Sequence, residues 1–272
     1  MSLETKVKEL VQEVKNTEQV EKYIFLSIGK PNIKAQVKLL KNLRYLERDI
    51  LKHCKNFKKK SGEVPHWIKL DAVTQVETAS FNSVKKELIE TRRNYIDFGI
   101  AFDSYWNMTF LPEEINANAF VRPDKKTKQM FLSEDNINNY LKKYTVHKKG
   151  YSHQFFENKE VNKFWTKGYI LILDEEKIYE LHEKGYEKGL RRVDDLHDEI
   201  DNLIQNGVEF LQRMLYNNGR YNYGYFPHFD KEISFYNMLR HSSSTYALIE
   251  GLTYLGRDLK PIEKAIDYII NN

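Results

Sequence analysis

The side chains best suited to chemistry gather toward the C-terminal end of the chain. The turn signal Asn218-Gly219 is followed by tyrosines at alternate positions, Tyr221, Tyr223 and Tyr225. Both turn residues tolerate positive φ, and an alternation with period two predicts a short extended segment with one tyrosine face. Tyrosine joins an apolar ring to a hydroxyl group, which suits the C–H face and polar rim of a sugar. The segment therefore predicts a sugar-like binding site.

An arginine–histidine pair follows on a predicted helix over residues 235–255. Arg240 offers a fixed fork of donors for a carboxylate or phosphate, and His241 can exchange a proton near neutral pH. We predict Arg240 and His241 as catalytic residues, with His241 as general acid or base. The predicted ligand-binding residues are Tyr221, Tyr223, Tyr225, His228, Tyr236 and Asn237. Whether the site catalyses a reaction stays open, because a half-buried strand and a capping Arg-His pair explain the same pattern.

The run from Tyr223 to Gly256 resembles the opening of an α/α toroid, the helical barrel of many bacterial glycan-processing enzymes and cell-surface polysaccharide proteins. The resemblance covers about residues 218–256 and implies a carbohydrate-linked role. A closed toroid needs many more helices than the one that follows this segment, so we expect only the start of a toroid or another packing. The matching positions are Tyr236, Asn237, Leu239, Arg240, His241, Tyr246, Ala247 and Leu248.

The bulk composition excludes several protein classes. Of the 272 residues, 41% are apolar, enough for a hydrophobic core, and 30% are charged. No apolar run reaches the roughly 18 residues of a membrane span, and no signal peptide is visible, so we expect a cytoplasmic protein. A single cysteine, Cys54, excludes an internal disulfide and cysteine-based zinc sites. No cofactor and no metal site are predicted, because neither a helical histidine pair nor a phosphate-binding glycine loop is present.

Hydrophobic periodicity predicts an α+β fold that is predominantly α-helical. We expect N-terminal helices over residues 1–60, a small mixed α/β lobe over 61–175, and a helical lobe over 176–272. The last of these is the lobe that resembles the start of an α/α toroid.

Individual elements follow from the same patterns. Strands are predicted at 68–77 and 168–174. A helix N-terminus at Pro112 accounts for the acids Glu113 and Glu114 without catalysis. The predicted longer helices cover residues 3–28, 33–57, 175–188, 191–216 and 235–255, with a last helix opened by Pro261.

The main interpretation is a carbohydrate- or polysaccharide-related protein whose site around residues 221–241 binds a glycan or an acidic sugar. One alternative is a non-catalytic interaction module of a larger assembly, with self-association or partner contact through the apolar stripe of helix 261–270. A second is nucleic-acid binding through the basic helix 33–60. A solvated face with a cationic C-terminus explains those charges equally well, and the net charge of +4 does not decide the matter.

Overall fold

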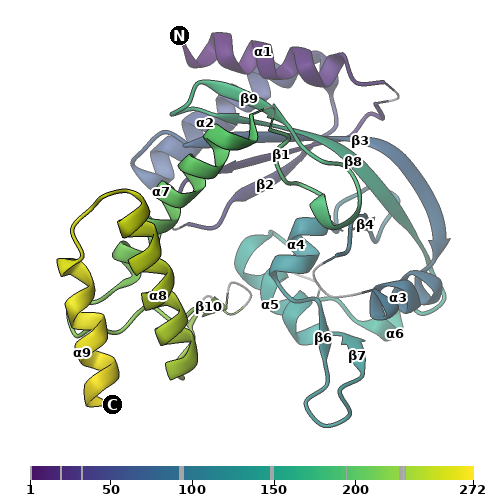
Figure 1. Ribbon diagram of the computed structural model, residues 1–272. Coiled ribbons are helices and arrows are strands. Elements are labelled where there is room, and N and C mark those ends of the chain that lie inside the picture. The colour runs from purple at the N-terminus through teal and green to yellow at the C-terminus, as the bar shows by residue number, and fades with distance from the viewer. Residues whose placement is uncertain are drawn as a thin grey trace. The chain divides into compact units, whose positions relative to one another are not determined.

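The computed structural model describes residues 2–18, 20–31, 33–91, 95–147, 150–193, 195–226, 229 and 231–272. The chain forms two compact units. Unit 1 comprises Met1–Arg192 with Pro227–Phe229, and unit 2 comprises Val193–Phe226 with Asp230–Asn272. Figure 1 shows unit 1 in purple to green and unit 2 in green to yellow.

The main structure of unit 1 is an antiparallel sheet. Across the described residues it has seven strands in the order β2-β1-β3-β8-β4-β5, with β9 paired to β8, and it curls along β3 and β8 (Figure 1). The prediction of a predominantly α-helical fold is therefore wrong, and the chain has a mixed α/β fold. The strands are β1 (Ile24–Gly29), β2 (Gln36–Leu40), β3 (Trp67–Ser80), β4 (Gly99–Ala101), β5 (Thr109–Phe110), β8 (Glu160–Ile172) and β9 (Lys177–Glu180).

Two long strands form the centre of this sheet. Strand β3 pairs with β8 along its length, from Trp67 opposite Ile172 to Ser80 opposite Glu160, and the register shifts between Val73 and Gln75. The strands predicted at 68–77 and 168–174 are confirmed, although β8 begins earlier than predicted. Such a bulge bends the strand that carries it and increases the local twist, which is consistent with the curl of the sheet.

Two helices pack on one face of the sheet. Helices α1 (Leu3–Lys15) and α2 (Leu46–Ser61) bury their apolar stripes against strand residues such as Leu26 and Leu70. The Ser2 side chain caps α1 by accepting from the Thr5 N–H, and Gly62 ends α2 with a φ of 80°. Glycine adopts such a positive φ with little steric strain because it has no Cβ.

Three helix predictions in unit 1 are wrong. The end of helix 3–28 is the buried strand β1, because a short continuous apolar run fits a central strand as well as a helix. Helix 33–57 is replaced at its start by β2 and by the 3₁₀ turn η1 (Leu43–Tyr45), so the basic helix 33–60 does not exist as one element. The 175–188 segment contains β9 and the 3₁₀ turn η2 (Gly185–Glu187) instead of a helix.

The remaining elements of unit 1 enclose a second, aromatic core. It gathers Phe81, Phe102, Phe110, Tyr140 and other buried residues. The helix predicted to begin at Pro112 is confirmed. These elements are α3 (Phe81–Glu90), α4 (Pro112–Ala117), β6 (Val121–Pro123), β7 (Met130–Leu132), α5 (Glu134–Tyr144) and α6 (His153–Phe156).

Unit 2 is mainly helical and has its own small core. The predicted helices at 191–216 and 235–255 and the last helix are confirmed, with bounds shifted by a few residues. Buried Val208, Leu248, Leu252 and Ala265 hold these helices together. The elements are α7 (Leu196–Met214), β10 (Tyr225–Phe226), β11 (Lys231–Glu232), α8 (Met238–Tyr254), the 3₁₀ turn η3 (Lys260–Ile262) and α9 (Glu263–Asn271). Within the described parts of the chain, every helix is too short or too polar to cross a membrane.

Candidate functional site

A small pocket in unit 2 lies within the stretch singled out in the sequence. Its volume is about 210 Å³, and its lining is mainly polar. The bridge between Leu215 and Tyr221 and the short β10–β11 hairpin bring its two sides together. The lining residues are Tyr216, Asn218, Arg220, Tyr221, Asn222, Tyr223, Glu232, Ile233 and Tyr236.

The turn at Gly219 fixes one side of the pocket. Gly219 has a φ of 83°, and a Cβ there would lie 2.2 Å from the carbonyl oxygen of Lys264. Both the backbone conformation and the close approach to α9 therefore require glycine. The Asn218 side chain closes the turn by accepting from the Arg220 N–H at 3.1 Å. The Asn-Gly pair thus holds the segment that begins with Arg220 against α9.

Two guanidinium groups lie over aromatic rings at this site. The Arg220 guanidinium is 4.4 Å from the centre of the Tyr236 ring, and that of Arg240 is 5.2 Å from the centre of the Tyr223 ring. Neither arginine forms an ion pair with a carboxylate of the described residues. Glu232, which also lines the pocket, accepts from the Asn222 side chain at 3.4 Å. Of the two arginines only Arg220 lines the pocket, which thus offers one cationic donor, an acceptor and ring faces together.

His241 belongs to a buried hydrogen-bond chain. The Ala265 carbonyl can only accept, so the His241 Nε2–H donates to it, at 2.9 Å. The other ring nitrogen, Nδ1, is hydrogen-bonded to the Tyr236 hydroxyl at 2.6 Å, and that hydroxyl accepts from the Tyr221 N–H at 2.9 Å. The His241 side chain is 2% exposed, and the Tyr268 ring stacks on it. Because the ring is buried and does not line the pocket, this geometry gives no support to a catalytic role.

Some of the predicted ligand-binding residues line the pocket and others lie outside it. Tyr221, Tyr223 and Tyr236 line the pocket, whereas Tyr225 lies outside it, about half exposed in β10. The predicted tyrosine face is therefore divided, since Tyr221 is buried and Tyr225 exposed. Asn237 is the N-cap of α8, and its side chain accepts from the Arg240 N–H at 3.1 Å. His228 lies outside the described residues.

Sequence reasoning missed a cluster of charges in unit 1. The Lys69 ammonium lies 3.1 Å from Asp71 Oδ2 and 2.9 Å from Glu113 Oε1. Lys188 Nζ donates to the carbonyl and hydroxyl oxygens of Thr166, at 2.6 and 2.8 Å. A signal was present, because the alternation of β3 places Lys69 and Asp71 on the same face of a strand whose neighbours are buried. Glu113 lies in the first turn of α4, as predicted, but it also forms this ion pair.

Burial controls the protonation of this cluster. Asp71 is 1% exposed, and burial raises its pKa to about 6, against the opposing effect of the Lys69 ammonium. Burial by itself would lower the pKa of Lys69, but the carboxylates of Asp71 and Glu113 raise it above its ordinary value. Burial lowers the pKa of Lys188. Buried groups with shifted pKa values occur in structural ion-pair networks as well as in active sites.

Neither a metal centre in the described part of the chain nor a similarity to known proteins points to a function for this chain. No three histidine, cysteine, aspartate or glutamate side chains of the described residues gather closely enough to hold a metal ion. Comparison of the chain with known protein families, curated proteins and solved structures gave no match. The resemblance to an α/α toroid therefore stays a prediction.

Proposed function

We propose that the chain binds a glycan, without converting it, in the pocket between residues 216 and 236. The observation that carries the proposal is the combination of polar donors and acceptors with tyrosine ring faces in one small hollow. Binding sites for polar ligands use such convergent polar groups to fix orientation. His241 is buried and does not line the pocket, which favours binding over catalysis.

The size and charge of the pocket favour one acidic sugar residue of the glycan. A volume of about 210 Å³ is below the roughly 300–1,000 Å³ of pockets that enclose drug-sized ligands. The Arg220 guanidinium lines the pocket and has no carboxylate partner among the described residues. A planar guanidinium suits the two oxygens of a uronic acid carboxylate. Tyr223 would stack on the C–H face of the ring, and Glu232 would accept from hydroxyl groups.

Calorimetric titration of oligosaccharides tests this proposal. We expect a uronic acid oligosaccharide to bind more tightly than its uncharged counterpart. Arg220→Gln should remove that preference, a loss of about tenfold for one charge-assisted contact. Tyr223→Ala should weaken both ligands by at least about tenfold, because the stacking surface is lost.

Arg213→Gln is the matched control, because Arg213 is an exposed arginine of the same unit outside the pocket. This variant should bind as the unaltered chain does. Equal affinities of the Tyr223→Ala variant and the unaltered chain would show that the glycan binds elsewhere or not at all. Turnover of any oligosaccharide that is abolished by His241→Gln, in a variant that remains folded, would restore the catalytic interpretation.

A further inference from the structure

Helix α7 leaves most of its apolar stripe uncovered. Between Leu196 and Met214 only Val208 is buried, although Leu203, Ile204 and Leu211 lie on the same stripe. Leu203 is 57% exposed. Helices of globular proteins cover such a stripe with a neighbouring element, and exposed apolar patches mark interaction sites.

This stripe forms one wall of an apolar groove of about 730 Å³ between α7 and α8. Gly207 lines the groove, and no atom lies within 4 Å of an ideal Cβ at this position, so the space beside it is open. At Gly251 a Cβ would lie only 2.4 Å from the Val208 side chain, so the two helices cross closely there. Helices α7 and α8, which form the walls of the groove, therefore pack closely against each other at this crossing.

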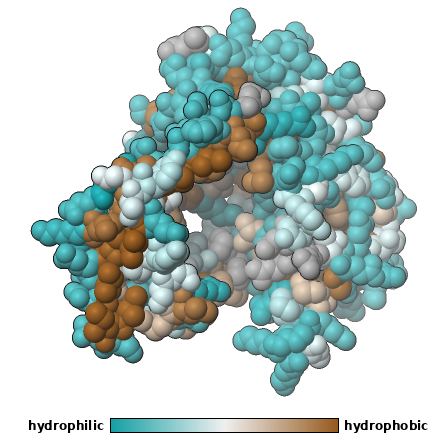
Figure 2. Space-filling model, viewed as in Figure 1, coloured by the Kyte–Doolittle hydropathy of each residue, from teal (hydrophilic) through white to brown (hydrophobic). Residues whose placement is uncertain are grey.

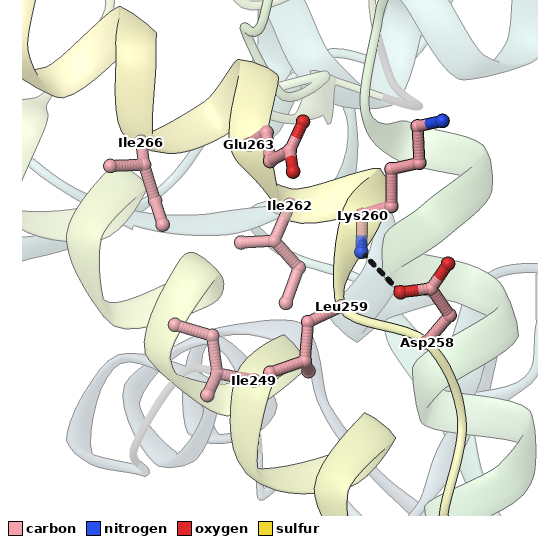
Figure 3. A pocket seen from close by; sticks show the side chains of 7 residues that line it. All are labelled: Ile249, Asp258, Leu259, Lys260, Ile262, Glu263 and Ile266. Atoms are coloured by element: carbon pink, nitrogen blue, oxygen red, sulfur yellow. Dashed lines mark hydrogen bonds between the residues drawn. The ribbon is translucent and has the colours of Figure 1, made fainter.

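A second apolar groove, of about 560 Å³, continues the first toward α9. Ile249 lines both grooves, and Leu259, Ile262 and Ile266 line the second. Figure 3 shows these apolar side chains turned toward a common hollow, while the side chain of Lys260 points away from it. In Figure 2 apolar residues gather over α7 and α9. The two grooves form one continuous apolar surface on unit 2.

The charges along this surface are mainly negative. Three carboxylates, Glu250, Asp258 and Glu263, line the grooves, against one ammonium group, that of Lys260. Within the described residues none of the three carboxylates forms an ion pair. Asp258 accepts from the Lys260 backbone N–H at 3.0 Å (Figure 3), and Glu250 accepts from the Tyr246 hydroxyl at 2.7 Å. A partner with positive charge beside an apolar stripe would complement this surface.

We propose that this surface of unit 2 binds a basic amphipathic helix of a partner protein. Apolar side chains at positions i, i+3, i+4 and i+7 of that helix would enter the two grooves. Its flanking lysine or arginine side chains would meet Glu250, Asp258 and Glu263. This interaction uses a surface that shares no lining residue with the glycan pocket.

Three labelled peptides of about five helical turns test the proposal by fluorescence polarisation with the full chain. The first has leucine at helical spacing with lysine elsewhere, the second has glutamate in place of lysine, and the third has the first composition in scrambled order. We expect the first to bind, more weakly at high salt, and the others to bind at least about tenfold more weakly. Gly207→Leu should fill the groove without a clash and reduce binding of the first peptide by about tenfold or more.

Asn202→Leu is the matched control, since it adds the same side chain to an exposed α7 position outside the groove. It should leave peptide binding unchanged, and circular dichroism should show both variants folded. Equal binding by the Gly207→Leu and Asn202→Leu variants would overturn the proposal, as would equal binding of all three peptides. A dimer in sedimentation equilibrium that Gly207→Leu dissociates would assign the surface to a second copy of this chain instead.

Discussion

Replacement of His241 by alanine should destabilise unit 2 by about 3–5 kcal/mol, the range for a large buried side chain whose loss leaves a cavity and orphaned polar groups. The substitution removes the hydrogen-bond partner of the Tyr236 hydroxyl and the donor to the Ala265 carbonyl. It also removes the surface on which the Tyr268 ring stacks. For a unit of this size the melting temperature should fall by more than about 10 °C. Differential scanning calorimetry measures it directly.

Two further variants separate the hydrogen bonds from the packing. Tyr236→Phe keeps the ring and removes the hydroxyl, so it should destabilise unit 2 by only about 1–2 kcal/mol. His197→Ala is the control, because His197 is a highly exposed histidine of α7, and its loss should change stability by less than about 0.5 kcal/mol. A His241→Ala variant as stable as the His197→Ala variant would show that the buried chain of hydrogen bonds does not hold unit 2 together.

Lys69→Met should destabilise unit 1 by about 3–5 kcal/mol at pH 8, the range for a buried ion pair that loses one partner. The variant leaves the buried carboxylate of Asp71 beside that of Glu113 without the ammonium that lies 3.1 and 2.9 Å from them. Urea unfolding followed by circular dichroism would measure the change. Lys86→Met removes an exposed pair with Glu90 and should change stability by at most about 1 kcal/mol.

The loss of stability caused by Lys69→Met should become smaller as the pH falls. Burial raises the pKa of Asp71 from 3.8 to about 6 in the folded chain, so the folded state holds this proton more tightly than the unfolded state does. Protonation of Asp71 therefore stabilises the folded state by at most about 3 kcal/mol. This stabilisation is fully present below about pH 4 and is lost as the pH rises through 6. Without Lys69 the Asp71 pKa should rise further. An equal loss of stability in Lys69→Met at pH 5 and at pH 8 would contradict this account. The double variant Lys69→Met with Asp71→Asn should recover stability at pH 8, because it no longer buries an unpaired Asp71 carboxylate.

Part of the candidate site was predictable because its signals are local. The Asn218-Gly219 turn, the tyrosines that follow it and the helix after Asn237 depend on backbone preferences of adjacent residues, and the structure shows a turn and a helix at these places. The role of His241 was not predictable. Its partners Tyr236 and Ala265 lie on either side of α8 in the sequence, and only the packing of α9 on α8 brings Ala265 to it.

The extent of the sheet around its two predicted central strands was missed for a related reason. Strand β1 is buried at every position, so its sequence lacks the alternation that distinguishes a strand from a helix. Strand β9 pairs with β8, and its conformation depends on that partner more than on its own lysine- and glutamate-rich sequence. The charge cluster required Lys69, Glu113 and Lys188 to meet from three distant segments, which no local pattern encodes.

The pairing of β3 with β8 also determines when the sheet can form during translation. Ser80 lies opposite Glu160 and Trp67 opposite Ile172, so a long loop must close before the centre of the sheet exists, and such closure slows folding. A ribosome-bound nascent chain that ends before residue 160 leaves one edge of β3 open to other chains. Chaperone capture during translation should therefore cease once β8 has emerged from the ribosome. Fragments that end within α5 should aggregate, whereas fragments that extend beyond β8 should not.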